Sequence, residues 1–589
     1  MRRSKAISAW SMLAASALVL SACGGGGDDA ADANSGSTVD VKSLAEGKAQ
    51  EGDTFKLADV PEMDPVTVAV DEGYSAYNNN TADANSSYNN YVLTSVIAGP
   101  TVLDGNNKVL LNGDVMESIE VTSEDPFTVE WKMKQGVKWS DGDEWDCREF
   151  YFAWLASSGT TDGFNSASTT GYELMTPECT DDYTFKAEFS EPYLDYKGMF
   201  ADVRLMPAHI VEKELGIDDI RDVEPKSKEA KEVAEFWSGE WKGFKPEIMP
   251  GSGPYKIKSF DSNSDTVVLE KNPHWIGAKG GPKEVTIRAI PDTKAMATAL
   301  QNGEIDVAAS TQPDATAADT LKSLASQGVK YASAPQLTYE HLDLNLNRDV
   351  FKDEAARKAF FEVVNREEIV NKLLKPVQAD AKPLGSIVFF SSEEGYEDRY
   401  SDKMNKGAEA AMKTLEEGGW KKGPDGIYAK DGVKFSVEIS HNENARRSQT
   451  VEIIQSQARA AGIEIKDDTD PNFLKGRVDK GDYDIALFGW SSAPFKAESK
   501  AIYISDGNQN WQGLSDPKID EAFDKATSAT KPEDALKNYI AADEAIAENY
   551  ATVPLFETPS MWAFRGIDRV YMQSYNGALW NVGEWEAAE

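Results

Sequence analysis

The sequence predicts a mixed α/β protein, because helix-like and strand-like segments alternate along it. In the clearest unit, the amphipathic segment 445–461 ends at Gly462 and leads directly into the apolar alternating segment 463–465. Repeated units of helix, glycine and strand build open α/β sheets. The chain has 589 residues, of which 41% are hydrophobic and 14 are Trp, and this composition excludes wholesale disorder. Its length corresponds to about three structural units of ordinary size.

The N-terminus has the pattern of a bacterial lipoprotein signal peptide. A basic segment at 1–5 precedes an apolar stretch at 6–20, which is shorter than the ~20 apolar residues of a membrane-spanning helix. The stretch ends in LSAC at 20–23, which resembles a lipobox. We therefore expect residues 1–22 to be removed and Cys23 to be acylated; an ordinary secretory signal with a chance cysteine is the alternative. Residues 23–53 are rich in Gly, Ala, Asp and Ser, and are predicted to form a flexible tether.

The charge of the chain excludes several partners. Residues 1–22 carry three basic groups and no acidic one, so the chain from Cys23 has 58 Lys and Arg against 99 Asp and Glu, a formal charge of −41. Such a charge repels phosphate backbones and anionic lipids, so we expect no nucleic-acid partner and membrane contact through the lipid anchor only. The expected location is the extracellular face of a bacterial membrane, and the glycine-rich tether favours a Gram-positive organism.

Two cysteines follow Cys23 in the chain. Free thiols are uncommon in exported proteins, so we predict a disulfide between Cys147 and Cys179. It would close a loop of about 30 residues and contribute about 3 kcal/mol in the chain-entropy model. A metal-binding pair is the alternative, but no histidine lies near either cysteine in the sequence.

The first half of the chain contains mainly strand patterns. Alternating valines at 66–70 predict a strand, and 128–134 predicts another that is followed by tight turns, the second at 139–142. The aromatic segment 149–156 fits either a short helix or a buried strand, since periodicity does not separate the two. Segment 182–189 alternates again and is predicted to be a strand.

Helices dominate the rest of the chain. The predicted helices are 292–301, 353–374, 408–417, 445–461 and 532–549. Asp292 is the expected N-cap of the first of these, and Gly303 follows its end before a predicted strand at 305–307. The acidic run 467–470 is predicted to be a solvated turn.

The sequence contains no catalytic constellation that we recognise. Its four histidines are His209, His274, His341 and His441. They form no HExxH motif and no pair within helical reach, and the chain has neither a GxxxxGK[ST] loop nor a GxGxxG after a strand. Segment 489–493 superficially resembles a nucleophile elbow, but Pro494 interrupts the helix that an elbow needs and no histidine follows. We expect no enzyme, no cofactor and no metal.

A second motif only mimics a site. Asp343, Asn345 and Asn347 have the spacing that begins a calcium loop, but Arg348 stands where that loop needs glycine. The segment HLDLNLN at 341–347 alternates, so we predict a strand with both asparagines on one face.

Eight segments, in order along the chain, form a set of motifs. The longest is WKMKQGVKWSDGDEWDCREFYFAW at 131–154. The others are LMPAH at 205–209, GSGPY at 251–255, LEKNPHW at 269–275, GEID at 303–306, the helix at 353–369, GIEI at 462–465 and GDYDIALFGW at 481–490. Together they resemble the motifs of the family 5 solute-binding proteins of ABC importers, the oligopeptide, dipeptide and nickel-binding type. The resemblance spans about 55–580, and with the lipobox it points to an actinobacterial lipoprotein branch of the family.

The resemblance implies a fold and a domain organisation. The fold is the two-lobed periplasmic-binding-protein type II fold of cluster C, with an extra subdomain inserted in lobe I. The expected parts are lobe I at 54–335 with its subdomain at about 101–200, lobe II at 336–559, and a C-terminal return to lobe I at 560–589. The strand at 341–347 and the segment 554–558 are the expected crossings between lobes.

The resemblance also implies a function. It predicts a monomer that captures a small peptide or similar polar solute between two closing lobes and delivers it to an ABC permease and ATPase complex. Peptide-binding members have an Asp, three residues after the equivalent of Trp490, that pairs with the α-amino group of the peptide. That position is Ala493 here, and the neighbouring acid is Glu498. The alternative is a lipoprotein of the same fold that regulates cell-wall phosphatidylinositol mannoside synthesis without an importer.

Aromatic and polar loop residues are the expected ligand contacts. Trp and Tyr supply a large contact area, and Asn offers both a donor and an acceptor. The predicted contacts are Tyr74, Tyr77, Asn78 and Asn79 in lobe I, and Trp490, Ser491, Asn510 and Trp511 in lobe II. The alternative is that the Trp residues belong to the core and the Asn run forms a turn.

Overall fold

A computed structural model describes residues 53–105, 108–201, 203–310, 314–492, 495–571, 573 and 579–588. The predicted signal peptide, the predicted lipid-attachment residue Cys23 and all of the predicted tether except residue 53 lie outside these ranges, as does Ala493. Within the described ranges, no helix combines the length and the apolar composition that a bilayer crossing requires.

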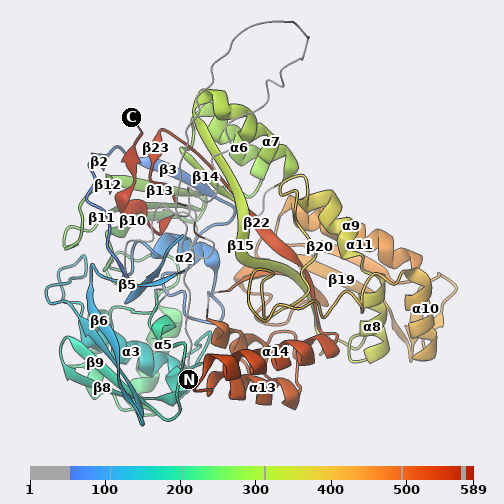
Figure 1. Cartoon of the computed structure of the whole chain (residues 1–589), viewed down its shortest axis with the longest axis horizontal. Helices are drawn as coiled ribbons and strands as arrows, with labels where there is room; N and C mark the ends of the chain where they lie inside the picture. The colour runs from blue at the N-terminus through green and yellow to red at the C-terminus, as the bar shows by residue number, and fades with distance from the viewer. Residues whose placement is uncertain are drawn as a thin grey trace, which may run out of the picture. The chain divides into compact units, whose positions relative to one another are not determined.

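The main structural element is a large mixed sheet (Figure 1). Its strands are β3 (Val66–Val70), β10 (Tyr255–Asp261), β11 (Thr266–Lys271), β13 (Glu284–Ala289), β14 (Val307–Ser310), β15 (Val329–Leu344), β19 (Ser436–His441), β20 (Glu464–Thr469), β21 (Ile485–Ser491) and β22 (Thr552–Arg565). Among the described residues their order is β10-β11-β13-β3-β14-β22-β15-β21-β19-β20. The strands predicted at 66–70 and around 305–307 are therefore present, the second beginning at Val307.

Two long strands, β15 and β22, connect the two halves of this sheet, and Figure 1 shows them side by side. They pair antiparallel along most of their length, with a shift in register between Pro335 and Tyr339. Before the shift β22 has β14 as its other neighbour, and after the shift β15 has β21. The connection between the halves therefore lies around 335–339 in β15, a few residues before the predicted crossing strand.

The predicted strand at 341–347 is wrong at its C-terminal end. β15 ends at Leu344, and Asn345 and Asn347 lie outside it. The side-chain oxygen of Asn345 accepts a hydrogen bond from the backbone N–H of Asn347 at 3.0 Å, while its Nδ2 donates to the carbonyl oxygen of Tyr483 at 3.0 Å. This local side-chain bond turns the chain and ends the alternation.

Buried apolar residues form separate cores at the two ends of the sheet. The first core is built from residues 66–309 and 562–585, joined by Ala332 and Ala497. Five of its tryptophans are almost completely buried: Trp131, Trp139, Trp145, Trp241 and Trp585. The second core consists of two clusters whose residues all lie within 339–556. Each core contains enough apolar side chains to be a packed interior of its own.

A smaller antiparallel sheet belongs to the first core. Its order is β6 (Met116–Glu124), β7 (Phe127–Met133), β9 (Thr184–Phe189), β8 (Met175–Asp181). The ambiguous aromatic segment is a helix, α3 (Cys147–Ser157), because Asp146 and Glu149 form a capping box at its start. A disulfide joins Cys147 at the beginning of α3 to Cys179 in β8.

The described residues also contain short strands outside these two sheets. They are β1 (Thr54–Phe55), β2 (Glu62–Met63), β4 (Thr101–Leu103), β5 (Val109–Asn112), β12 (Gly281–Pro282), β16 (Lys421–Lys422), β17 (Tyr428–Lys430), β18 (Val433–Lys434), β23 (Ile567–Asp568) and β24 (Glu586–Ala587). The remaining helices outside the second core are α2 (Ser87–Leu93), α4 (Ala208–Leu215), α5 (Lys228–Gly239), α6 (Thr293–Asn302) and α7 (Ala315–Ser323). Helix α6 has the predicted Asp292 N-cap, and Gly303 ends it in the left-handed region at φ 74°.

The helices that pack on the second core include close matches to the three predicted at 408–417, 445–461 and 532–549. They are α8 (Glu354–Val363), α9 (Arg366–Ile369), α10 (Ala408–Glu417), α11 (Ala445–Ala460), α12 (Lys500–Tyr503), α13 (Pro517–Thr527) and α14 (Pro532–Glu548). The single helix predicted at 353–374 is wrong, because α8 ends at Val363 and Asn365 caps the separate helix α9. The buried guanidinium of Arg366 donates to the carbonyl oxygen of Pro554 at 2.8 Å, and this tertiary contact fixes the break.

The acidic run at 467–470 is not the predicted turn. β20 continues to Thr469, and two of its carboxylates have partners. Asp467 bonds to the ring of His441 at 3.0 Å, and Asp468 pairs with Arg477 at 2.8 Å. Paired carboxylates at a sheet edge replace the solvated charges that the sequence suggested.

Candidate functional site

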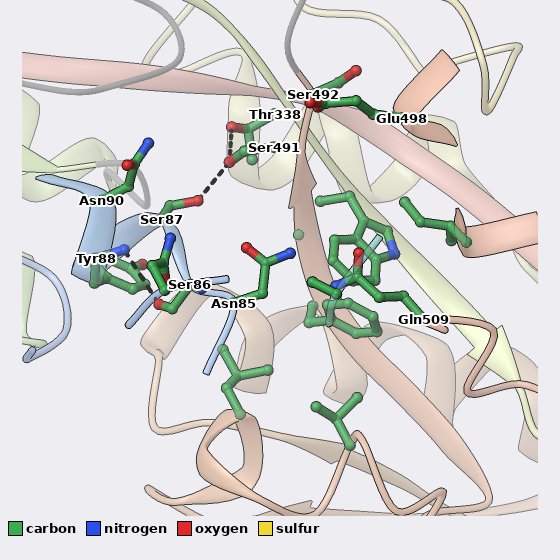
Figure 2. Close-up of a pocket in the computed structure, with 18 of the residues that line it drawn as sticks. Asn85, Ser86, Ser87, Tyr88, Asn90, Thr338, Ser491, Ser492, Glu498 and Gln509 are labelled. Carbon is green, nitrogen blue, oxygen red and sulfur yellow. Dashed lines mark hydrogen bonds between the residues drawn. The ribbon is translucent and has the colours of Figure 1, made fainter. Parts of the chain in front are cut away.

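A pocket of about 170 Å³ is lined by residues from both sides of the connecting strands (Figure 2). One side, which we term the polar wall, consists of Asn79, Asn80, Asn85, Ser86, Ser87, Tyr88, Asn90 and Tyr91. The opposite side, which we term the aromatic wall, consists of Leu474, Val478, Phe488, Trp490, Ile502 and Trp511. Ser491, Ser492, Glu498, Gln509 and Arg447 also line the pocket, from the chain of the second core.

The polar wall is organised by hydrogen bonds between its own side chains and backbone. The side-chain oxygen of Asn79 accepts from the N–H of Ser86 at 2.9 Å, and the N–H of Asn80 donates to Asn78 at 3.0 Å. Ser86 is the N-cap of α2, and its hydroxyl accepts from the N–H of Tyr88 at 3.2 Å. The first residues of α2 therefore lie at the pocket, as Figure 2 shows for Ser87.

The aromatic wall is organised by packing. β21 supplies Phe488 and Trp490, and the ring of Trp511 packs on Trp490 with 5.1 Å between centroids. His341 lies next to these rings, 4.4 Å from Phe488 and stacked at 6.5 Å on Trp490. Trp490 is only 9% exposed and belongs to the second core, whereas Trp511 is half-buried. Trp511 therefore offers more of its surface to a ligand.

A buried ion pair supports the pocket. Arg447 donates to both carboxylate oxygens of Glu340, at 3.0 Å from Nε and 2.6 Å from Nη2, and the two side chains are 4% and 1% exposed. Burial lowers the pKa of Arg447 and the Glu340 carboxylate raises it; the carboxylate prevails, so the guanidinium stays charged. Arg447 also donates to the side chain of Asn442.

The charged groups that line the pocket are close to balance. Besides Arg447, the lining contains Arg204 and Glu498, whose side chains form an ion pair at 3.7 Å. With Glu340 compensating Arg447, the formal charge of these four groups is zero. Among the described residues that line the pocket, each cation therefore has an anionic partner and none is left uncompensated for a polyanion.

Direct hydrogen bonds join the two sides of the pocket. The hydroxyls of Ser87 and Ser491 lie 2.8 Å apart, and Ser491 is equally close to Thr338 in β15 (Figure 2). Outside the pocket lining, Asn442 donates to the Glu72 carboxylate at 2.7 Å. Burial raises the pKa of Glu72 above its ordinary value.

Four of the predicted ligand contacts line this pocket, namely Asn79, Trp490, Ser491 and Trp511. The other four do not, and their polar atoms have intramolecular partners. Tyr74 and Tyr77 are buried in the first core and donate to the carbonyl oxygens of Gly243 and Pro250. Asn78 donates to the carbonyl oxygen of Trp237 at 2.8 Å, and Asn510 accepts from the N–H of Leu514 at 2.9 Å. These four side chains therefore support the fold and do not line the pocket.

Sequence reasoning missed several lining residues. Ser86 is the N-cap of the short helix α2 and Ser87 is its first residue, so an N-cap signal there could have directed attention to the start of α2. Arg447 gave no such signal, because its partner Glu340 is 107 positions away in the sequence. Across the described ranges, no group of three or more His, Cys, Asp or Glu could hold a metal ion.

Comparison with known proteins identifies relatives of the chain. Residues 111–512 match the family model of bacterial extracellular solute-binding proteins, family 5. The oligopeptide-binding protein OppA of Mycobacterium tuberculosis is 25% identical over 550 residues, which cover 90% of this chain and 87% of that protein. An uncharacterized lipoprotein of Mycobacterium leprae is 24% identical over 556 residues, with coverage of 88% and 93%.

Solved structures share the fold. The periplasmic EDTA-binding protein EppA gives a TM-score of 0.76 at 24% identity and covers 92% of this chain and 99% of its own. AppA from Bacillus subtilis, in complex with a nonapeptide, gives 0.74 at 22% identity, with coverage of 90% and 100%. NikZ from Campylobacter jejuni, in complex with Ni(L-His), gives 0.70 at 22% identity, again with coverage of 90% and 100%. The predicted fold class is thereby confirmed.

Proposed function

The chain belongs to family 5 of the bacterial extracellular solute-binding proteins, which bind solutes and are not enzymes, and from this premise we propose that it captures peptides for an ABC importer. The observation that carries the proposal is the pocket with two chemically different walls. Related proteins support it, since the Mycobacterium tuberculosis relative is named an oligopeptide-binding protein and the related AppA structure contains a nonapeptide.

The chemistry of the two walls suits a peptide. Asn and Ser side chains in the polar wall offer donors and acceptors to the backbone amides of a bound chain. The indole of Trp511 and its apolar neighbours offer contact area to a side chain of varied shape. Because the charged groups at the pocket compensate one another, neutral or zwitterionic ligands are favoured over polyanions.

In this proposal, the α-amino group of the peptide is not the main determinant of binding affinity. The sequence has Ala493 where peptide-binding members of the family have the partner of that group. The acid that lines the pocket, Glu498, is paired with Arg204 at 3.7 Å. We expect N-acetylated peptides to bind within about threefold of their free counterparts, which corresponds to less than about 1 kcal/mol.

Closure around the ligand completes the proposed mechanism. In it the two cores belong to two lobes with the boundaries predicted above, and β15 and β22 form the hinge between them. A ligand that contacts both walls binds the closed form better than the open one, and about 5 kcal/mol of differential affinity moves a hinge from mostly open to mostly closed. The closed form then presents the solute to a permease, while the acyl group on Cys23 holds the monomeric protein at the membrane. Changing Cys23 to Ala should release it into the soluble fraction; continued membrane retention would contradict the lipid anchor.

A thermal-melting experiment tests the peptide proposal. The chain from residue 24 is melted alone, with a pool of synthetic tripeptides to nonapeptides, with the same pool N-acetylated, and with citrate as a polyanion. A ligand at one hundred times its Kd stabilises the folded state by about 2.7 kcal/mol, so we expect both peptide pools to raise the melting temperature and citrate to leave it unchanged. No shift with either peptide pool, or a shift with citrate alone, would contradict the proposal.

A further inference from the structure

The segment Phe495–Ser499 connects the two cores next to the pocket. It follows β21 of the second core, and its last four residues form a short 3-10 helix. Yet Ala497 is fully buried in the first core, and among the described residues it is the one member of that core between Ala332 and Trp562. A segment of one core thus packs inside the other.

Phe495 and Ala497 both hold the segment on the first core. The N–H of Ala497 donates to the carboxylate of Asp195 at 3.2 Å. The ring of Phe495 lies against Gly198, where an added side-chain carbon would lie 2.6 Å from the ring. Gly198 does not have positive φ, so its lack of a side chain makes room for the ring and is not needed for the backbone. Phe495 also lines a separate apolar cavity of about 70 Å³ with Trp275 and Trp580.

The same segment reaches the ligand pocket. Glu498 and Ser499 line it, and Glu498 pairs with Arg204, which comes from the chain of the first core. Between these residues Lys496 forms an ion pair with Glu393, from the chain of the second core. Phe495 and Ala497 therefore pack against the first core, while Lys496 forms its ion pair with the second. Glu498 and Ser499 lie at the pocket.

We infer that Phe495 is a positioning residue for this pocket: its ring, seated on Gly198, holds Glu498 and Ser499 in place against the first core. The inference uses the pocket of the proposed function but does not depend on the identity of the ligand. The segment is held on the first core by this ring, by the Ala497 N–H and by the Glu498 pair with Arg204. The ring is one of the contacts that hold the segment, so unseating it should free the segment locally and leave the rest of both cores unaffected.

A compensating pair of substitutions tests the inference. Gly198→Ala places a methyl group 2.6 Å from the ring and should unseat it, while Gly198→Ala combined with Phe495→Leu removes the clash and should restore the seat in part. Gly239→Ala is the matched control, since it lies at the end of α5, does not have positive φ, and an added carbon would meet nothing within 4 Å. The readout is hydrogen exchange of the ligand-free chain over 495–503 and 195–204, with thermal melting in parallel.

We expect Gly198→Ala to speed exchange of both segments by about tenfold, which corresponds to a loss of about 1.4 kcal/mol of local protection, with the melting temperature nearly unchanged. The double variant should return part of the protection, and Gly239→Ala should match the parent. Equal exchange in parent and Gly198→Ala would overturn the inference, and so would faster exchange that the double variant does not reduce. Because no ligand is used, failure of peptide binding would contradict the proposed function and leave this result standing.

Discussion

The two walls of the pocket are built in different ways. The polar wall comes from one short stretch of chain, 79–91, whose side chains bond to neighbouring backbone groups. The aromatic wall gathers residues from 474 to 511 and is held by ring packing on the second core and by the buried pair of Arg447 and Glu340 close by. The polar wall should therefore be locally stable, while the aromatic wall should depend on the integrity of the second core.

We expect the largest change in stability from removing Arg447, which supports the aromatic wall. Arg447→Met removes the guanidinium that pairs with the buried Glu340 carboxylate, so we expect the free energy of unfolding to fall by about 3–5 kcal/mol. Urea denaturation followed by tryptophan fluorescence measures this change. The matched control is Arg477→Met, whose ion pairs are about one-quarter exposed and whose loss should cost less than about 1 kcal/mol. Similar losses in the two variants would show that the pair near the pocket has no special role.

Trp511→Ala should affect ligand binding more than stability. Trp511 is half-buried and lines the pocket, so its loss should weaken peptide binding by about 1.4–2.8 kcal/mol, roughly tenfold to a hundredfold. Titration calorimetry with a peptide that shifts the melting of the parent measures this. Trp490→Ala is the comparison: because Trp490 is 9% exposed in the second core, we expect it to lose stability as well. Unchanged affinity in Trp511→Ala would place the ligand elsewhere.

Ser86→Ala should perturb the polar wall only. The Ser86 hydroxyl caps α2 by accepting from the N–H of Tyr88, and loss of such a cap costs about 1 kcal/mol. Hydrogen exchange should increase at the start of α2 and stay unchanged in β21. Exchange that rises equally in both elements would mean that the walls are not independent.

The smallest expected effect is a dependence on pH. Burial raises the pKa of Glu72 above 4.5, so the folded state binds the proton more tightly than the unfolded state. The contribution of Glu72 to stability is therefore greatest below about pH 4.5 and is lost as the pH rises through the folded-state pKa. Glu72→Gln removes this contribution to the pH dependence of stability and keeps an acceptor for Asn442. Melting curves from pH 4 to 8 test it; parallel curves for parent and variant would contradict the assignment.

Much of the fold could be predicted wherever a local signal decides the structure. Helix α6 has its predicted cap at Asp292 and its predicted end at Gly303, and α10 has the predicted bounds. Prediction failed where a distant contact decides. The predicted helix at 353–374 is broken where Arg366 bonds to Pro554, and the acidic run near 467 extends a strand because its carboxylates meet His441 and Arg477.

The same holds for the candidate site: local signals predicted part of it, and contacts between distant residues decide the rest. The family resemblance directed attention to loops that meet at the pocket, and Asn79, Trp490, Ser491 and Trp511 line it. Within those loops, residue type did not distinguish a lining side chain from a buried one. Tyr77 is completely buried, with its hydroxyl bonded to Pro250, and no local pattern shows that. A side chain's direction depends on packing that only the folded chain specifies.

The most direct test of the account is mass spectrometry of the molecules that co-purify with the chain expressed from residue 24 and are released by mild denaturation. Micromolar affinity already corresponds to about −8 kcal/mol, enough for carry-over through a rapid purification. We predict a ladder of peptides of mixed sequence, reduced in Trp511→Ala. A phosphatidylinositol mannoside or another glycolipid fragment in place of peptides would contradict the importer and favour the regulatory lipoprotein.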